Sequence, residues 1–411
     1  MGSATYRAGA FLQAARGLGL QVIVGVDLPP DLAPPRPDRL ALSFGQPDAA
    51  VAALVDYARA NPVGALLAVD DGATLIAARA AAALGLPHNA PDAAYAARDK
   101  YVMRGRLAAG GAPIPAYRLY STADDPDLLT REAPYPCVVK PTLLSGSQGV
   151  IRADNPAEFV AAFRRAAAIV RSASGQPEGA LLVEHYIPGD EVVLEGLLAA
   201  GQLTVLALFD KPDPLVGPFF EETIYVTPSR LPAAVQQQIA AAAAQACAAL
   251  GLREGPIHAE LRVNERGPWI VEVAGRSIGG HCSRTLRFGA ADASLEELIV
   301  RRAMGLPAPT WRQVGADGVM MIPIPQGGIL KRVDGVEAAR AVPLIQDVQI
   351  TAPCNHPLTP LPEGSSYLGF IFARGDTPAQ VEAALRAAHS HLRVVTLPRL
   401  PVLSRPPVAA Q

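Results

Sequence analysis

Two glutamates, Glu260 and Glu272, are expected to face each other across a β-hairpin. Period-two alternation along 257–263 places His258, Glu260 and Arg262 on one face of the first strand. Two carboxylates directly opposite each other repel, but a divalent cation between them makes the pairing favourable. The hairpin therefore predicts a site for Mg²⁺ (or Mn²⁺), against the plainer interpretation of a solvated face with two unrelated glutamates.

The register of this hairpin and the segment that follows it also bear on ligand binding. Pairing of Val263 with Trp269 would bring the two glutamates directly opposite each other. Beyond the second strand, Arg276 can hold a carboxylate or a developing phosphoryl charge. Gly279 and Gly280 then allow the backbone to approach a ligand closely. A surface ion pair and an ordinary turn are the alternatives for these residues.

Lysine is so rare in this sequence that its positions are informative. The chain has four lysines among its 36 basic residues: Lys100, Lys140, Lys211 and Lys331. Lys140 ends the apolar segment 136–141, shortly before the small-residue loop 145–149, and a stray charge at the end of a buried strand is costly. No GxxxxGK[ST] or GxGxxG phosphate motif occurs. Any nucleotide is therefore expected to meet strand lysines and a glycine loop.

Alternating strands and helices in the first hundred residues must support these groups. Strands are predicted at 21–27 and 65–70, and helices at 5–18, 48–60, 73–84 and 92–109. This alternation predicts a parallel sheet covered on both faces. A domain of this kind normally begins with a strand, whereas the sequence opens on a helix.

From residue 136 the pattern changes to hairpins and capped helices. Strands at 149–153 and 180–187 flank a helix with Asn155 as N-cap and Pro156 at its first position. The remaining predicted elements are a hairpin at 191–210, a helix at 232–250 that ends at Gly251, the carboxylate hairpin at 257–275 and a helix near 377–390.

Composition argues against several functional classes. The net charge of −2, with both signs interspersed, argues against a nucleic-acid-binding face. No apolar run is long enough to cross a membrane. The cysteines Cys137, Cys247, Cys282 and Cys354 show neither CxxC nor zinc-ligand spacing. Reduced thiols and a cytoplasmic location are therefore expected.

Five segments follow one another in order: 98–101, 138–149, 182–191, 258–262 and 270–276. Together they resemble the ATP-grasp ligases, and in particular the carboxylate–amine ligases that include the L-amino-acid ligases. The resemblance implies an α/β fold with α+β parts. It consists of an N-terminal Rossmann-like parallel-sheet domain at 1–95, an ATP-grasp domain at 96–305 with a lid at about 135–188, and a C-terminal α+β module at 306–411, similar to that of biotin-carboxylase-type relatives.

The resemblance also implies roles for the matching residues. The residues that would bind ATP are Lys100, Lys140, Ser147, Gln148, Gly149, Glu184, Tyr186, Ile187 and Glu191. Among them the two lysines contact the phosphates, loop 145–149 closes over these, 184–187 reads the adenine and Glu191 accepts from the ribose. Glu260 and Glu272 match the metal ligands, Arg276 and Lys211 the catalytic cations, and Arg284, Gly279 and Gly280 the substrate side, with Glu195 as a further candidate. Many family members carry an asparagine where this chain has Ala274, so one metal ligand is lost or replaced by water, which we interpret as the mark of a subgroup.

The activity implied by the resemblance is ATP-dependent conversion of a small carboxylic or amino acid into an acyl-phosphate, which an amine then attacks. Dipeptide synthesis is one form of this reaction. The alternatives are a bicarbonate-activating carboxylase-type enzyme and a nucleotide-binding module without turnover. Small carboxylate and amine substrates are the expected partners, rather than nucleic acid or membrane. A homodimer, common among such relatives, stays open.

Overall fold

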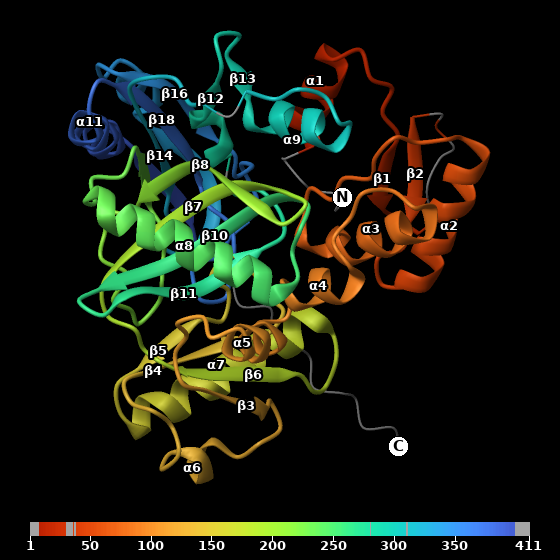
Figure 1. Ribbon diagram of the computed structural model, residues 1–411. Helices are drawn as coiled ribbons and strands as arrows, with labels where there is room; N and C mark the ends of the chain where they lie inside the picture. The colour runs from red at the N-terminus through yellow and green to blue at the C-terminus, as the bar shows by residue number, and fades with distance from the viewer. Residues whose placement is uncertain (1–7, 30–35, 37, 280, 310, 399–411) are drawn as a thin grey trace, which may run out of the picture.

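The computed structural model describes residues 8–29, 36, 38–279, 281–309 and 311–398, and one large antiparallel sheet lies at its centre (Figure 1). Its strand order is β11-β10-β7-β8-β9-β14-β18-β16. The strands are β7 (Asp190–Ala199), β8 (Gln202–Asp210), β9 (Ile224–Thr227), β10 (Gly255–Asn264), β11 (Gly267–Ala274), β14 (Ala316–Ile322), β16 (Ile345–Ile350) and β18 (Gly369–Gly375). The predicted hairpins at 191–210 and 257–275 are thus present, and the sheet runs without interruption across the boundary expected at 305/306.

Alternate residues of the central strands supply two separate cores. On β7, Leu194 joins the core beneath α8 (Ala233–Leu250) and α5 (Lys100–Ala109). Its neighbour Val193 joins the opposite core, beneath α9 (Leu295–Ala303). Helix α8 stops where glycine was predicted to stop it, because Gly251 takes up the left-handed conformation with φ 82°.

The C-terminal part of the chain completes the sheet and adds a third core. Helix α11 (Pro378–Ser390) packs on β14 and β18 and begins with a capping box formed by Thr377 and Gln380. The other elements of this part are the short 3₁₀ segment η2 (Cys282–Thr285), β12 (Arg287–Phe288), β13 (Ala293–Ser294), β15 (Gly328–Asp334), α10 (Val336–Arg340), β17 (Pro357–Leu358) and β19 (Arg393–Leu397). Strands β17, β15 and β19 form a small antiparallel sheet beside the large one.

A second antiparallel sheet, of order β3-β6-β4-β5, lies below the central sheet and is here called the lid (Figure 1). Its elements are β3 (Tyr117–Ser121), α6 (Pro126–Leu129), β4 (Cys137–Pro141), β5 (Ile151–Ala153), α7 (Pro156–Ser174) and β6 (Ala180–His185). Asn155 caps α7 as predicted, since its side chain accepts from the Glu158 amide. Strand β3 belongs to the same sheet, although it lies before residue 135, where the lid is expected to begin.

The N-terminal region differs most from expectation. Its elements are α1 (Ala8–Gly17), β1 (Val24–Asp27), β2 (Arg39–Leu42), α2 (Pro47–Ala60), α3 (Asp71–Leu84) and α4 (Pro91–Ala96). Among the described residues of this region, only β1 and β2 pair, and they do so in parallel. The predicted strand at 65–70 is irregular and pairs with neither of them. The predicted helix 92–109 is divided in two, because the Asp99 side chain accepts from the Tyr101 and Val102 amides and starts a new helix at Lys100.

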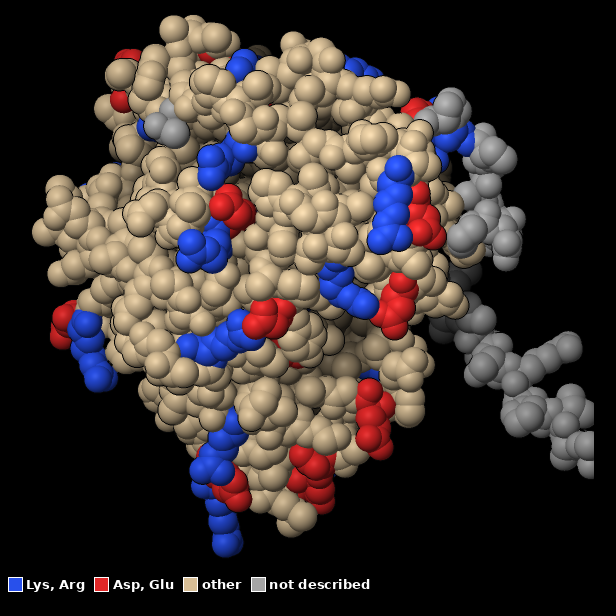
Figure 2. Space-filling model, turned by 45° about the vertical axis from the view of Figure 1, so that its right-hand side comes forward, with Lys and Arg blue, Asp and Glu red and all other residues tan. Residues whose placement is uncertain are grey.

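The surface carries charges of both signs, as the composition predicts. On the face that Figure 2 shows, Lys and Arg side chains lie next to Asp and Glu, and there is no broad patch of one sign. Among the described residues, no helix combines the length and the apolar character that a membrane span requires.

Candidate active site

The carboxylate hairpin brings Glu260 and Glu272 opposite each other, as predicted. The register at its end was predicted wrongly: Val263 pairs with Pro268, not with Trp269. A bulge corrects the difference, because the register shifts between Glu260 and Leu261. Sequence alternation cannot reveal a bulge. The prediction that the two glutamates face each other was therefore correct, although the register from which it was inferred was wrong.

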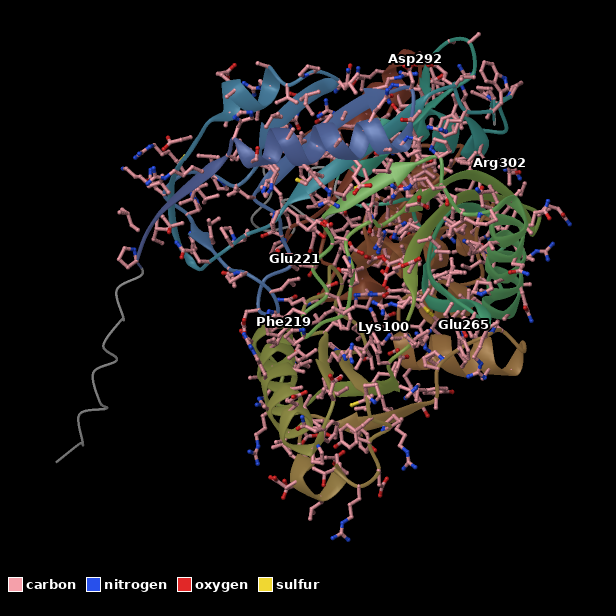
Figure 3. The ribbon with its side chains drawn as sticks, turned by 90° about the vertical axis from the view of Figure 1, so that its left-hand side faces the viewer. Lys100, Phe219, Glu221, Glu265, Asp292 and Arg302 are labelled. Atoms are coloured by element: carbon pink, nitrogen blue, oxygen red, sulfur yellow. The ribbon has the colours of Figure 1, made fainter. Side chains whose placement is uncertain are left out.

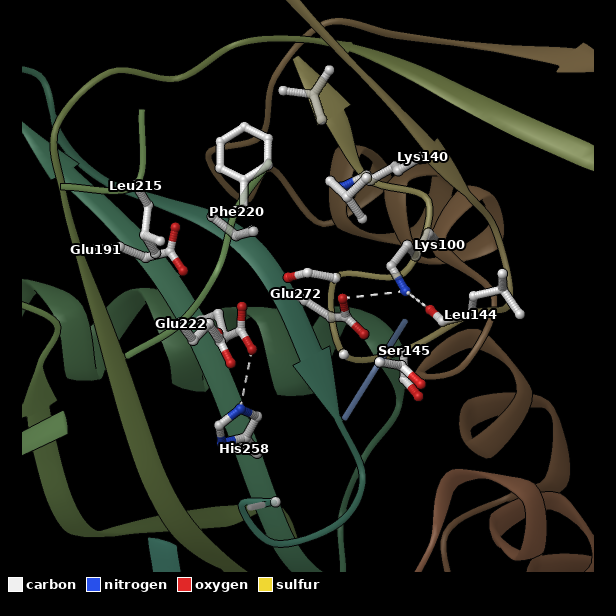
Figure 4. A pocket seen from close by; sticks show the side chains of 18 of the residues that line it. Lys100, Lys140, Leu144, Ser145, Glu191, Leu215, Phe220, Glu222, His258 and Glu272 are labelled. Atoms are coloured by element: carbon white, nitrogen blue, oxygen red, sulfur yellow. Dashed lines mark hydrogen bonds and ion pairs between the residues drawn. The ribbon is translucent and has the colours of Figure 1, made fainter. Parts of the chain in front are cut away.

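A cavity of about 430 Å³ lies where the lid, the central sheet and the N-terminal region meet. This volume is in the range of small-ligand sites. Most predicted site residues line it, namely Lys100, Lys140, Ser147, Glu184, Tyr186, Ile187, Glu191, Glu260, Glu272, Arg276 and Gly279. Figure 4 shows lysines from one side of this cavity facing carboxylates from the other.

At the lid end, Lys140 and Arg104 share the buried carboxylate of Glu184. Lys140 Nζ lies 2.5 Å from Glu184 Oε2, and Arg104 Nε donates to Oε1 at 2.5 Å. Burial would raise the pKa of Glu184, but the two cations outweigh it and hold that pKa below its ordinary value. Burial lowers the pKa of Lys140 in spite of Glu184.

Arg104 also links the lid end to the carboxylate hairpin. Its Nη2 donates to the carbonyl of Val271 at 2.5 Å, and Val271 is the residue of β11 that the bulge leaves without a partner on β10. Arg104 is 1% exposed, and its Nη1 is buried without a hydrogen-bond partner among the described residues.

Lys100 joins the loop after β4 to the second glutamate of the hairpin. Its Nζ donates to the carbonyl of Leu144 at 2.8 Å and lies 3.3 Å from Glu272 Oε2 (Figure 4). Within the adjoining loop, Gly146 and Ser147 have φ values of 63° and 56°. Two consecutive residues in this region form a tight turn, in which the Gln148 amide donates to the carbonyl of Ser145 at 3.4 Å.

A buried cluster of carboxylates surrounds Lys211 at the foot of the cavity. The oxygens of Glu191, Glu222 and Glu260 lie within 4.8 Å of one another. Lys211 Nζ lies 2.6 Å from Glu191, 2.5 Å from Glu222 and 3.7 Å from Glu260. Burial would lower the pKa of Lys211, but the three carboxylates raise it well above its ordinary value, so the lysine is charged. Arg262 adds a second cation, because its Nε donates to Glu191 at 2.9 Å.

His258 holds the other side of Glu260. Its Nε2 lies 3.2 Å from Glu260 Oε1, and its Nδ1 contacts Glu195, whose second oxygen accepts from the Ile278 amide at 3.0 Å (Figure 4). Burial would lower the pKa of His258, but Glu195 and Glu260 raise it to about 9. The imidazolium and Lys211 together outweigh burial and lower the pKa of Glu260.

Arg276 extends into the cavity from the end of β11 and is held by the N-terminal region. Its Nε donates to Asp71 Oδ1 at 2.6 Å and its Nη1 to the carbonyl of Ser277 at 3.0 Å. Asp71 is the first residue of α3 and contributes to the cavity wall. The N-terminal region therefore orients the cation that was predicted to face the reacting groups.

Several predicted residues do not line the cavity. Gln148 and Gly149 bind the C-terminal part of the chain, through Glu363 and Pro362. Arg284 forms an ion pair with Asp347 at 3.2 Å. Lys211 acts from behind the wall, through its carboxylate cluster, and the predicted Gly280 lies outside the described residues.

Sequence reasoning missed Arg104, Asp71 and Glu222. Glu222 is the second residue of a Glu-Glu pair after two phenylalanines, and Asp71 is the second of an Asp-Asp pair after an apolar segment. An acidic pair that follows an apolar segment was therefore the available signal. Arg104, in the middle of a helix, gave none.

The described structure is a mixed α/β protein whose ligand cavity lies between a small lid sheet and a large antiparallel sheet. Three family models match it in turn: the ATP-grasp N-terminal domain at 12–88, the ATP-grasp domain at 133–285 and the L-amino acid ligase C-terminal domain 2 at 320–397. The chain belongs to the ATP-grasp family, as its five segments predicted.

Individual relatives agree with this assignment. The crystal structure of an L-amino acid ligase from Bacillus licheniformis superposes with a TM-score of 0.80 and 25% identity, over 94% of this chain and 95% of that one. Alanine–anticapsin ligase of Bacillus subtilis is 29% identical over 219 residues, which are 49% of this chain and 46% of the relative. The chain spans between 46% and 62% of the length of the first curated relatives.

A carboxylase structure shares the fold alone. The biotin carboxylase domain of the Hydrogenobacter thermophilus 2-oxoglutarate carboxylase superposes with a TM-score of 0.66 and 16% identity, over 95% of this chain and 88% of that one. The C-terminal segment, which was expected to be similar to that of carboxylase-type relatives, matches the model of the L-amino acid ligase C-terminal domain 2 at 320–397.

Proposed function

We propose that the protein is an ATP-dependent carboxylate–amine ligase that works through an acyl-phosphate. One observation carries the proposal: a single cavity holds the lysines Lys100 and Lys140, the opposed carboxylates Glu260 and Glu272, and the guanidinium of Arg276. Phosphoryl transfer requires cations around the transferring group and little else from the protein. The match to L-amino acid ligases supports the same reaction class.

The proposed reaction has two steps. A carboxylate oxygen of the first substrate attacks the γ-phosphorus of ATP, and the bond from that phosphorus to the β,γ-bridging oxygen breaks, which releases ADP. The amine nitrogen of the second substrate then attacks the acyl carbon, and the bond from that carbon to the phosphate oxygen breaks. The departing phosphate carries away the proton that the nitrogen loses. Lys100 and Lys140 neutralise charge on the phosphates in the first step. Arg276, oriented by Asp71, stabilises the oxyanion of the second.

The carboxylates of the site suit a divalent cation, for which we propose Mg²⁺ or Mn²⁺. Glu260 and Glu272 supply hard oxygen ligands on facing strands, and Glu191 and Glu222 lie close enough to Glu260 to take part. Such an ion neutralises phosphate charge when it is bound. His258 and Lys211 keep Glu260 ionised and fixed in place for this role.

At the nucleotide end we keep the roles implied by the sequence. Segment 184–187 and Tyr186 face the adenine, while Glu191 serves the ribose and loop 145–149 the phosphates. The side chain of Glu191 also binds Lys211 and Arg262. The proposed ribose contact is tested by replacing Glu191 and measuring the affinity for ATP. Tight ATP binding by Glu191→Ala, which removes the acceptor, would refute that role.

The substrates of the proposed ligase are a small amino acid as carboxylate donor and a second amino acid as amine. The test is metal-dependent phosphate release from ATP across amino acids, singly and in pairs, with bicarbonate as a separate arm. Release with particular pairs, and a product whose mass equals the pair minus water, is the expected result. Release with bicarbonate alone would favour the carboxylase alternative, and ATP binding without any release would favour a binding module.

A further inference from the structure

A short segment of the C-terminal part lies across the lid loop. Residues 362–367, here called the strap, lie between β17 and β18. The Pro362 carbonyl accepts from the Gly149 amide at 2.9 Å, and the Glu363 carbonyl accepts from Gln148 Nε2 at 2.8 Å. These contacts involve two of the residues that had been assigned to ATP from sequence.

The strap and the loop lie so close together that a side chain at Gly146 would crowd the strap. A Cβ on Gly146 would lie 3.1 Å from the Ser365 carbonyl oxygen, and Gly146 has φ 63°. A side chain there would be strained and crowded at once. The backbone of the loop is therefore fitted against the strap.

A two-point ion pair fastens the strap to the lid helix α7. Arg165 Nε and Nη2 donate to the two carboxylate oxygens of Glu363 at 2.6 and 2.9 Å. The guanidinium of Arg165 also lies over the ring of Phe219, 4.9 Å from its centroid. Figure 3 shows Phe219 beside the lid, below Glu221. Arg165 is thus held from two segments outside the lid.

The other end of the strap reaches the carboxylate cluster. Ser365 and Tyr367 line the cavity, and the Tyr367 hydroxyl donates to Glu222 Oε2 at 3.3 Å. Glu222 in turn binds Lys211 at 2.5 Å. A single segment of six residues therefore contacts both the loop over the cavity and the charged cluster within it.

We propose that the strap positions the lid loop over the nucleotide, with Glu363 as the positioning residue. The proposal rests on the proposed function in that ATP is taken as the nucleotide. The Arg165–Glu363 pair is nearly half exposed, at 45% and 43% of the side chains, and exposed pairs bind weakly. A weak, two-point contact suits a loop that must open to admit ATP and close before transfer, because it aligns the loop without locking it.

The first test measures the loop in the absence of nucleotide. Amide hydrogen exchange at Gly149 reports its bond to Pro362. Glu363→Ala and Arg165→Gln should each raise that exchange rate by about fivefold, which is the upper range for an exposed ion pair. The matched control is Arg164→Gln, one residue earlier on the same helix, whose ion pair with Asp127 is also exposed. Equal Gly149 exchange in Glu363→Ala and wild type would overturn the proposal.

The second test measures function and separates positioning from simple structure. Glu363→Ala should raise KM for ATP about fivefold, with a smaller effect on kcat, and should increase phosphate release when the amine substrate is left out. The reversed pair, Arg165→Glu with Glu363→Arg, should recover most of the KM. No recovery, or the same KM change in Arg164→Gln, would refute a positioning role.

The two tests also distinguish this proposal from the proposed function. Wild-type protein should show further protection of loop 145–149 when a non-hydrolysable ATP analogue is added. Protection in wild type with no difference in Glu363→Ala would leave the ligase proposal intact and remove the strap. No response of wild type to the analogue would refute ATP binding, and with it the nucleotide role of the strap.

Discussion

At the scale of single residues, the site is a set of buried charges that hold one another in place. Lys211, with 3% of its side chain exposed, is the centre of this set. Around it, burial and Glu260 raise the pKa of Glu222, although Lys211 opposes them. Without the lysine the three carboxylates of the cluster would repel one another in a poorly solvated space.

Replacing Lys211 should therefore damage stability before it damages chemistry. We expect Lys211→Ala to lower the free energy of unfolding by about 3–5 kcal/mol, the range for breaking a buried charge cluster. Urea unfolding is the measurement, with exposed Lys331→Ala as the control. Added Mg²⁺ should stabilise the variant more than wild type, because it can replace the missing cation. A loss equal to that of Lys331→Ala would show that the cluster stands without Lys211.

Glu272 should behave in the opposite way. Its side chain is 27% exposed and lies at the cavity, so Glu272→Ala should leave unfolding within about 1 kcal/mol of wild type. ATP turnover should fall below about 1% of wild type, because a metal ligand and a partner of Lys100 are lost. Glu265→Ala, at the exposed turn of the same hairpin (Figure 3), is the control. Normal turnover by Glu272→Ala would refute the metal assignment.

The Glu363–Arg165 pair has a defined pH dependence. The hydrogen bond that Arg165 donates lowers the pKa of the Glu363 carboxyl below its ordinary value. The stabilisation is thus complete above the unfolded pKa of about 4.3 and is lost as the pH falls through the lower folded value. A ¹³C titration of the Glu363 carboxyl should show its midpoint rise in Arg165→Gln and stay in place in Arg164→Gln. An unchanged midpoint in Arg165→Gln would contradict the pairing.

At the scale of elements, periodic segments could be predicted and irregular ones could not. Alternation along β10 placed His258, Glu260 and Arg262 on one face, and all three line the cavity. The strand predicted at 65–70 is not formed. An apolar run in the sequence does not reveal whether another strand lies beside it to pair with. Glu222 was missed because it lies between β8 and β9, where no period fixes the direction of a side chain.

Helix α7 offers a test of such a local signal. Asn155→Ala removes the acceptor of the Glu158 amide, so the free energy of unfolding should fall by about 1 kcal/mol. Asn155→Ser, which keeps an acceptor at the cap without bringing a second carboxylate against Glu158, should restore most of it. Thermal or urea unfolding of the three proteins is the measurement. Equal stability of Asn155→Ala and wild type would mean that tertiary packing alone fixes the start of α7.

At the scale of the whole molecule, the central sheet joins parts that sequence had divided. Strand β9 pairs with β14 across the expected 305/306 boundary, and Ile224 and Val226 share a core with Ile371. The division into domains at 1–95, 96–305 and 306–411 remains a prediction. So does the homodimer, for which light scattering in solution is the direct measurement.

The continuous sheet predicts that the C-terminal part cannot be removed. A fragment ending at residue 305 should lack near-ultraviolet circular dichroism and cooperative unfolding, because it exposes the edge of β9 and leaves Ile224 and Val226 without the rest of their core. Full-length protein treated with protease should likewise yield no stable fragment that ends near 305. A folded 1–305 fragment would establish two independent domains.

The walls of the cavity come from positions as far apart as Asp70 and Tyr367. A polypeptide that is still being made on the ribosome therefore lacks Ser365 and Tyr367, and with them part of the cavity wall, until synthesis has passed residue 367. Until then loop 145–149 also lacks its contacts with Pro362 and Glu363. Translation thus supplies the last part of the cavity wall long after it has supplied the lid.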